Sequence, residues 1–278
     1  MNNKGIYVSR SAYDEEYGKS LKLEYESRYA FISSKSTGVL ALSIADTADN
    51  ICLSPLLGDN ANSYAVRAAF LSWGYLVRKA ISNYLDIDSS ELNVGFYISP
   101  LTQKAEVFFV EQLENGAGYC NYLSGRRYSD VPLNAIVQPL VEGGNIYEQL
   151  MSHDHKHGCT SSCYDCIRDY SNQAIHGLLD WRLGLDLARL ANSSSAKVDF
   201  TLDYWDDYIF VVVKNMLTTQ GYVVERREDT LYGTDTLGDK FCVIHPLWSE
   251  SYINDLVKKL DPSCKRLSVF DISTSNVL

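Results

Sequence analysis

The chain has 278 residues, of which 46% are hydrophobic and 22% are charged. This length is enough to bury a sizeable core, and it lies where single cores tend to divide into two domains. The formal net charge of −10 excludes a general nucleic-acid coat protein, because such binding depends on clustered Lys and Arg that neutralise phosphates. Any contact with nucleic acid must therefore be local or supplied by a partner.

The predicted elements of the first half begin with a strand and a long helix. Apolar residues recur at helical spacing after a segment that can cap a helix, and glycines mark a loop after the last strand. The sequence predicts strands over 38–44, 92–98 and 105–111, a helix over 62–84, a loop at 115–118, and a helix over 135–153 that is interrupted near 143–144.

The second half starts with an apolar helix that ends near Asn192, and the serine-rich segment 193–196 follows it as a predicted linker. A compact pattern of helices and strands comes next. Helices are predicted over 204–217 and 249–260, and strands over 221–225, 240–245 and 267–270. We therefore predict an α+β protein with one domain over 1–192 and a small α/β domain over 197–278.

The N-terminus has no apolar run of signal-peptide length, and no stretch of 18 consecutive apolar residues occurs. We therefore expect a cytoplasmic protein that does not enter a membrane. Thiols stay reduced in the cytosol, so clustered cysteines there indicate metal ligands rather than disulfides.

Three of the seven cysteines lie within eight residues, at Cys159, Cys163 and Cys166. This spacing is typical of a zinc knuckle, in which one loop supplies two or three ligands and a distant residue completes a tetrahedral site. The alternative is a trio of thiols without a metal, and the spacing makes it the weaker interpretation. A catalytic cysteine with His176 as its base is weaker still, because zinc would remove the nucleophile from use.

The fourth ligand has two candidate sources in the sequence. Cys120 follows the glycine-rich loop, and a ligand from there would tie the two halves of the first domain together; this is the source that we favour. A lone cysteine is, however, more often a small buried hydrophobic residue. The alternative is an imidazole from the tract His153–His157, with His155 four residues before the first cysteine. Four protein ligands would leave no position for water, which indicates structural rather than catalytic zinc.

A string of polar residues follows the knuckle, and four arginines lie in or near it. They either form hydrogen bonds and ion pairs that orient the metal ligands, or they contact the phosphates of a nucleic acid or a partner. The sequence leaves both roles open for Arg126, Arg127, Arg168 and Arg182.

The segment from Cys159 to Leu183 reads Cys-x3-Cys-Tyr-x-Cys-x-Arg-x-Tyr-x-Asn-x3-His-x2-Leu-Asp-Trp-Arg-Leu. It resembles the zinc-binding C-terminal domain of MrfA-type superfamily 2 helicases and the DrmB subunit of the DISARM phage-defence system. The likeness extends over about residues 35–192. It implies a four-cysteine zinc site of Cys120, Cys159, Cys163 and Cys166, in a module that works beside a helicase motor.

The chain departs from those helicases in having no Gly-x4-Gly-Lys-Ser/Thr motif, so we expect no ATP hydrolysis by the helicase mechanism. We expect instead a non-enzymatic accessory subunit of a prokaryotic anti-phage defence or DNA-processing complex. A separate helicase or ATPase chain would then supply the motor, and DNA is a second expected contact.

An enzymatic alternative comes from charged residues in the C-terminal part, because phosphodiester cleavage commonly uses carboxylates that hold a metal, together with a lysine. Their spacing is not that of a functional Asp…Glu-x-Lys nuclease site, so this alternative is the weaker one. The residues are Glu225, Asp235, Asp239, Lys240 and His245.

Overall fold

The computed structural model describes residues 6–7, 28–29, 36–56, 63–125 and 133–274. The chain divides into a short N-terminal unit, Met1–Ser36, and a compact unit, Thr37–Leu278. In the first unit, strands β1 (Ile6–Tyr7) and β2 (Arg28–Tyr29) form an antiparallel pair. All that follows concerns the second unit.

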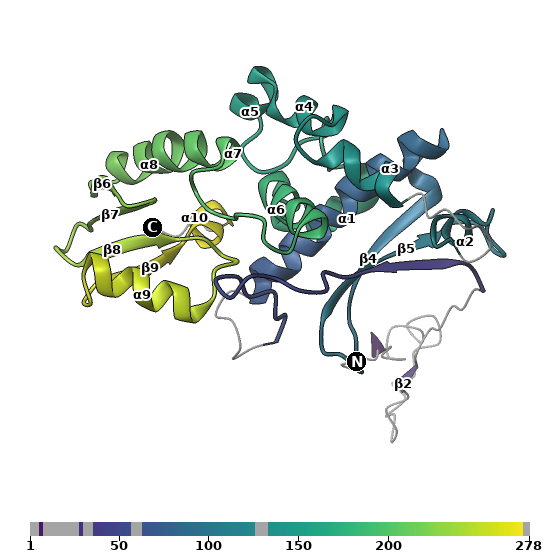
Figure 1. Cartoon of the computed structure of the whole chain (residues 1–278), viewed down its shortest axis with the longest axis horizontal. Helices are drawn as coiled ribbons and strands as arrows, with labels where there is room; N and C mark the ends of the chain where they lie inside the picture. Colours follow the sequence, from purple (N-terminus) through teal and green to yellow (C-terminus); the bar gives the residue numbers. More distant parts are fainter. Residues whose placement is uncertain (1–5, 8–27, 30–35, 57–62, 126–132, 275–278) are drawn as a thin grey trace, which may run out of the picture. The chain divides into compact units, whose positions relative to one another are not determined.

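A three-stranded antiparallel sheet and one long helix form the first layer of the second unit. The sheet order is β3-β5-β4, with β3 at Val39–Leu42, β4 at Leu92–Ile98 and β5 at Ala105–Glu111. Helix α1 (Ser63–Leu85) lies against β4 and β5 (Figure 1). Alternate residues of β5 are buried, as expected for a strand with one face on the core.

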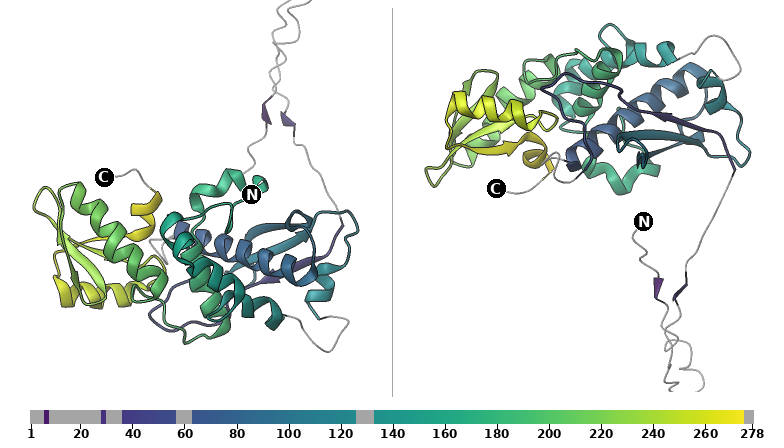
Figure 2. Two further views of the ribbon diagram at one scale, coloured as in Figure 1. Left: turned by 90° about the horizontal axis from the view of Figure 1, so that it is seen from above. Right: turned by 60° about the horizontal axis from the view of Figure 1, so that its bottom comes forward.

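Helix α6 (Trp181–Asn192) packs beside α1 (Figure 2). A 3₁₀ turn, η2 at Ser89–Glu91, connects α1 to β4. Between β5 and α6 the chain forms short helices: α2 at Tyr119–Leu123, α3 at Leu133–Val137, η3 at Gln138–Leu140, α4 at Asn145–Met151, α5 at His153–Gly158 and η4 at Tyr170–Leu178. The helix predicted over 135–153 is thus four short pieces. Pro139 lies at the start of the short η3, as expected because proline disrupts a longer helix. Gly144 is the N-cap of α4, at the interruption that the sequence predicts near 143–144.

The C-terminal part consists of a continuous helical stretch, a four-stranded sheet and two further helices. Its elements are α7 at Asp203–Asp207, the π-helix η5 at Tyr208–Val213, α8 at Lys214–Thr219, β6 at Val223–Arg227, β7 at Thr230–Thr234, β8 at Lys240–Ile244, α9 at Glu250–Leu260, β9 at Lys265–Ser268 and α10 at Val269–Thr274.

Strands β6, β7 and β8 pair antiparallel in chain order, and β9 pairs parallel to β8 after the crossover helix α9. Helices α8 and α9 are drawn above and below this sheet in Figure 1. The α+β fold class is therefore confirmed. Strand β7 was not predicted, and the last predicted strand lies two residues earlier and gives way to α10.

The predicted linker at 193–196 is a turn after α6, closed by a hydrogen bond from Ala196 N to the Ser193 carbonyl. Contacts cross this point: Trp248 Nε1 donates to the Val198 carbonyl at 2.9 Å, and Ile51 forms a β-bridge with Trp248. The division into domains 1–192 and 197–278 stays a prediction. None of the helices in the described part of the chain has the length and apolar character that a bilayer crossing requires.

Candidate metal centre

Four side chains converge between α5 and α6. The group consists of His155, Cys159, Cys163 and Cys166, and one potential ligand atom from each lies within 4.8 Å of all the others. The sulfur of Cys166 is 3.9 Å from that of Cys159 and 3.5 Å from that of Cys163. These separations are far longer than a disulfide bond of about 2.05 Å, and all three cysteines are free thiols.

The spacing of the sulfurs fits tetrahedral zinc. Zinc–sulfur bonds of about 2.3 Å at tetrahedral angles place two ligand sulfurs about 3.8 Å apart. Both measured separations, 3.5 and 3.9 Å, lie close to that value. Thiolate and imidazole are also the donors that zinc prefers in structural sites. By geometry and by chemistry, the four residues fit a zinc ion.

The imidazole of His155 has the arrangement of a metal ligand. Its Nδ1 donates to the Leu150 carbonyl at 2.9 Å, which leaves Nε2 without a proton. That Nε2 is buried and has no hydrogen-bond partner in the described part of the chain. Metal-binding histidines typically donate their second ring nitrogen to a carbonyl or carboxylate in this way. An edge contact with the Trp181 ring, at 5.1 Å between centroids, holds the imidazole from the other side.

Local hydrogen bonds shape residues 159–170, which carry the three cysteines and are called the cysteine loop below. Ser152 caps α5 by accepting from the backbone of His155, and this helix delivers the chain directly to Cys159. The carbonyl of Cys163 then accepts from the backbone N–H groups of Cys166, Ile167 and Arg168. This tight turn points Cys163 and Cys166 back toward Cys159.

The three thiols influence one another's protonation. Hydrogen bonds from the Cys159 thiol and the Cys163 backbone N–H lower the pKa of Cys166. The same Cys159–Cys166 hydrogen bond, together with burial, raises the pKa of Cys159. A divalent cation bound by the three sulfurs would hold them as thiolates, with release of protons.

Arg182 braces the cysteine loop from the protein interior. It is only 2% exposed, and its guanidinium donates to the carbonyls of Tyr204 at 3.0 Å, Thr160 at 2.6 Å and Cys159 at 3.4 Å. The central carbon of the guanidinium also lies over the Tyr208 ring, 3.9 Å from its centroid. These hydrogen bonds suit the bracing role, one of the two left open by the sequence; contact of Arg182 with phosphate stays a prediction.

Other polar residues of the string brace the opposite side of the loop. Asp169 caps η4 and forms an ion pair with Arg78 of α1. Asn172 donates to the Ile167 carbonyl at 2.8 Å and contacts His176 Nε2 at 2.7 Å. His176 is therefore engaged with Asn172 and is not placed as a catalytic base for the cysteines. Such contacts fix the orientation of metal ligands.

Cys120, the fourth ligand that the sequence favours, is not in the group. It lies on α2, where its thiol donates to the Phe109 carbonyl at 3.5 Å and its backbone N–H donates to Glu111 at 2.9 Å. Burial, followed by the Glu111 carboxylate, raises its pKa to about 12. The structure thus gives Cys120 the role of a small buried hydrophobic residue and brings His155 to the three cysteines in its place.

The remaining predicted contact residues differ in their placement. Arg168 is half-buried, and its Nε donates to Ser162 Oγ at 2.8 Å. Arg126 and Arg127 lie outside the described residues. Two tyrosines of the same loop are strongly exposed: Tyr164 is 67% and Tyr170 is 87% exposed. Both belong to the motif quoted from the sequence, and Tyr170 belongs to the polar string after the knuckle, but the sequence alone does not show that their rings are exposed.

The structure does not bring the residues of the nuclease alternative together. His245 is fully buried and contacts Asp186 of α6, and Asp235 caps the turn before β8 through its own backbone neighbours. The other three form separate surface ion pairs: Glu225–Arg227, Asp239–Lys265 and Lys240–Asp261. Within the described ranges, no second group of three or more His, Cys, Asp or Glu side chains converges as the cysteine cluster does.

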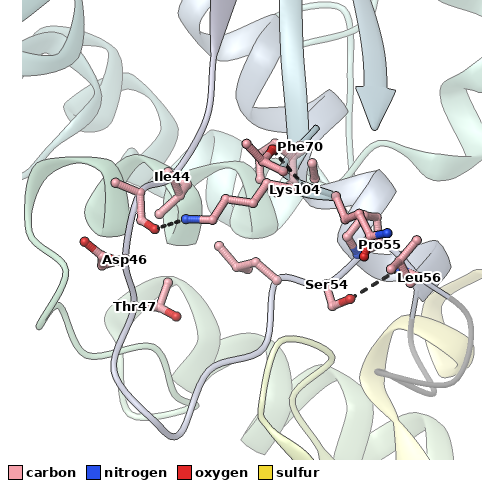
Figure 3. Close-up of a pocket in the computed structure, with 13 residues that line it drawn as sticks. Ile44, Asp46, Thr47, Ser54, Pro55, Leu56, Phe70 and Lys104 are labelled. Atoms are coloured by element: carbon pink, nitrogen blue, oxygen red, sulfur yellow. Dashed lines mark hydrogen bonds between the residues drawn. The ribbon is translucent and has the colours of Figure 1, made fainter. Parts of the chain in front are cut away.

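A pocket of about 350 Å³ lies away from the cysteines, between the segment after β3 and the turn between β4 and β5 (Figure 3). Phe70 and Ile44 form part of its apolar wall, and the Lys104 amine spans it to donate to the Ala45 carbonyl. None of the site residues predicted from the sequence lines it.

Comparison with known proteins agrees with the geometry. Residues 73–167 match the MrfA Zn-binding domain family, and this range contains all four clustered residues. The chain is also 32% identical over 147 residues to Druantia protein DruE of Escherichia coli (strain UMEA 4076-1). That match covers 50% of this chain but only 7% of DruE. No solved structure matches the chain.

The family match over 73–167 confirms the resemblance seen in the cysteine segment. Its range also covers most of α1, which contacts the cysteine segment through Arg78 and Lys79, and the whole β4–β5 hairpin. The His and Cys side chains that converge between α5 and α6 thus lie within the part of the chain that matches the MrfA Zn-binding domain family.

Proposed function

We propose that His155, Cys159, Cys163 and Cys166 bind one structural zinc ion. The observation that carries this proposal is the convergence of four nitrogen and sulfur donors within 4.8 Å, with the lone pair of His155 Nε2 left unused by any hydrogen bond. Four protein ligands fill a tetrahedral site and leave no position for a reactive water. The zinc would therefore hold the loop to α5 and α6 and would perform no catalysis.

We infer that the chain acts as a non-enzymatic accessory module in a prokaryotic anti-phage defence or DNA-processing complex. The match to the MrfA Zn-binding domain and the 32% identity to a segment of DruE, a protein of the Druantia defence system, support this role. The motor would be a separate helicase or ATPase chain, because these 278 residues hold no phosphate-binding Gly-x4-Gly-Lys-Ser/Thr motif.

The cysteine loop is the part of the surface best suited to touch DNA. Arg168 offers a cation, and the exposed rings of Tyr164 and Tyr170 offer faces on which unpaired bases can stack. The net charge of −10 over the whole chain disfavours binding over the rest of the surface. Contact with DNA would thus be confined to this loop and would weaken steeply as salt is added.

Copurification from the source cells tests the accessory role. The tagged chain is expected to retain a helicase-type ATPase that hydrolyses ATP on addition of DNA, whereas the purified chain alone hydrolyses none. The matched variant Cys163→Ser, which removes one zinc ligand, is expected to lose the ATPase, while Cys264→Ser keeps it. ATP hydrolysis by the isolated chain, or metal-dependent DNA cleavage that Glu225→Ala abolishes, would contradict the proposal.

DNA contact is tested separately with a fluorescent single-stranded oligonucleotide and the assembled complex. Replacing Tyr164 and Tyr170 together by Ala is expected to weaken binding by a factor of at least about ten, since base stacking contributes about 1–3 kcal/mol per ring. Exposed Tyr97, on β4 and away from the loop, provides the control Tyr97→Ala. Equal binding by the double variant and the control would leave a protein scaffold as the remaining role.

A further inference from the structure

Helix α5 carries histidines on two different faces. His155 points inward to the cysteines, whereas His153 and His157, one helical turn apart, both lie on the exposed side. The His153 side chain is 84% exposed. Residues four apart on a helix are neighbours on its surface, and the two rings are in contact, with 4.5 Å between their centroids and 61° between their planes.

This separation of the rings can be compared with that of two histidines bound to one metal ion. With a metal–nitrogen bond of about 2.0–2.1 Å, the ion lies about 3.2 Å from the centre of each ring. The centres are then about 4.5 Å apart when the two bonds meet at 90°, and about 5.2 Å apart at a tetrahedral angle. The observed separation of the ring centres, 4.5 Å, is compatible with the right-angled arrangement, which is typical of tetragonal and octahedral ions such as Cu²⁺ and Ni²⁺.

The surroundings of the two rings also suit a cation. His153 Nδ1 donates to the Asp154 carboxylate at 3.4 Å, which leaves His153 Nε2 available as a ligand and places a negative charge next to it. The nearby cation, Lys156, is neutralised by Asp207 at 2.6 Å. Neither imidazole nitrogen of His157 has a protein partner among the hydrogen bonds of the described residues.

We propose that His153 and His157 form a second metal site, which binds one exchangeable divalent transition-metal ion of the Cu²⁺ or Ni²⁺ type. Two protein ligands and several waters would hold this ion, so it would exchange readily. The buried centre differs in both respects, because its four protein ligands enclose a tetrahedral ion. The proposal does not depend on the role of the chain in a defence complex.

Nickel titration of the zinc-loaded protein tests the second site. Calorimetry is expected to show one Ni²⁺ bound per chain, while the zinc content, measured in the same sample, stays constant. His153→Asn and His157→Asn should each abolish nickel binding without changing zinc content or Tm, because both side chains are exposed and neither belongs to the buried centre.

A spacing variant is the matched control. His157→Asn combined with Gly158→His keeps the number of histidines but moves the second ring off the shared face of the helix, and a side chain at position 158 has open space around it. This variant should also fail to bind nickel. The proposal is overturned if the wild type binds no Ni²⁺ beyond its zinc, if bound nickel appears only as zinc is released, or if the spacing variant binds as well as the wild type.

Discussion

Cys163 supplies one of the three clustered sulfurs and is the only one of them that is half-buried rather than buried. We predict that Cys163→Ser abolishes zinc binding and lowers Tm by at least about 5–10 °C, because zinc binding can contribute on the order of 10 kcal/mol to folding and 1 kcal/mol shifts Tm by about 2–4 °C at this size. Elemental analysis and a thermal melt measure the two effects.

The control for this change is Cys264→Ser. Cys264 is buried beside Cys242, with 3.4 Å between the sulfurs, in the C-terminal sheet region. The Cys264→Ser variant should keep one zinc per chain. A wild-type protein that is well folded and contains no transition metal would refute the zinc centre altogether.

Substitutions at His155 and at Cys120 distinguish between these two candidates for the fourth zinc ligand. We predict that His155→Ala loses zinc, because it removes the only nitrogen donor in the cluster, whereas Cys120→Ser keeps one zinc per chain. The Cys120 variant should cost only the burial of a hydroxyl, about 1–3 kcal/mol. Zinc content is measured in both variants after dialysis against a weak chelator. Loss of zinc from Cys120→Ser but not from His155→Ala would identify Cys120 as the fourth ligand.

The sequence was sufficient to find three of the four clustered residues and insufficient for the fourth. Cys159, Cys163 and Cys166 lie in one loop, so their spacing alone indicates their proximity. The choice between Cys120 and His155 depends on where α2 packs relative to α5, and the spacing of residues does not contain that distance. The unused Nε2 of His155 is visible only once Leu150 is seen to take the proton on Nδ1.

At the scale of elements, the packing of α1 on the sheet depends on Gly74. A Cβ at this position would lie 2.4 Å from Val107 and 2.8 Å from Val94, which are on β5 and β4. We predict that Gly74→Ala destabilises the protein by about 1–3 kcal/mol, because such overpacking forces backbone or side-chain shifts. The free energy of unfolding in urea measures this loss of stability.

The matched change is Gly177→Ala, where an added Cβ meets no atom within 4 Å. It should leave the urea midpoint nearly unchanged. An equal loss at both positions would indicate that backbone conformation, and not the close approach of α1 to the sheet, determines the cost at Gly74.

Long elements with clear periodicity were predicted well, and short ones were not. Helix α1 and strands β4 and β5 lie within one residue of their predicted bounds, since their apolar positions repeat over many residues. Strand β7 was missed because a charged run precedes it and Gly233 interrupts its five residues. Its identity comes from pairing on both sides, with β6 and β8.

At the scale of the molecule, a buried polar network joins α6 to the C-terminal sheet region. Asp186 is fully buried and accepts hydrogen bonds from Tyr204 at 2.8 Å, Trp205 at 3.0 Å and His245 at 3.1 Å. The backbone N–H of Leu247 donates to His245 Nδ1, so His245 Nε2 carries the proton given to Asp186. The hydrogen bonds of these groups are complete only while α6 and the C-terminal sheet region are packed together.

This network bears on whether residues 197–278 fold independently, as the predicted domain boundary implies. Separated from α6, the fragment would leave His245 Nε2 and two aromatic donors without their acceptor, and Trp248 would lose its bridge to Ile51. Leaving a buried polar group unsatisfied costs about 1–3 kcal/mol each, a large share of the stability of a small domain.

We therefore predict that residues 197–278, expressed alone, show no cooperative unfolding transition, whereas residues 37–278 unfold in a single one. Fluorescence of the buried tryptophans during urea titration distinguishes the two results. Asp186→Ala in the longer chain should lower the free energy of unfolding by about 3–5 kcal/mol, because it removes the shared acceptor of three buried donors. If the fragment instead melts cooperatively, the C-terminal part is a separate domain, and Asp186 only docks it onto α6.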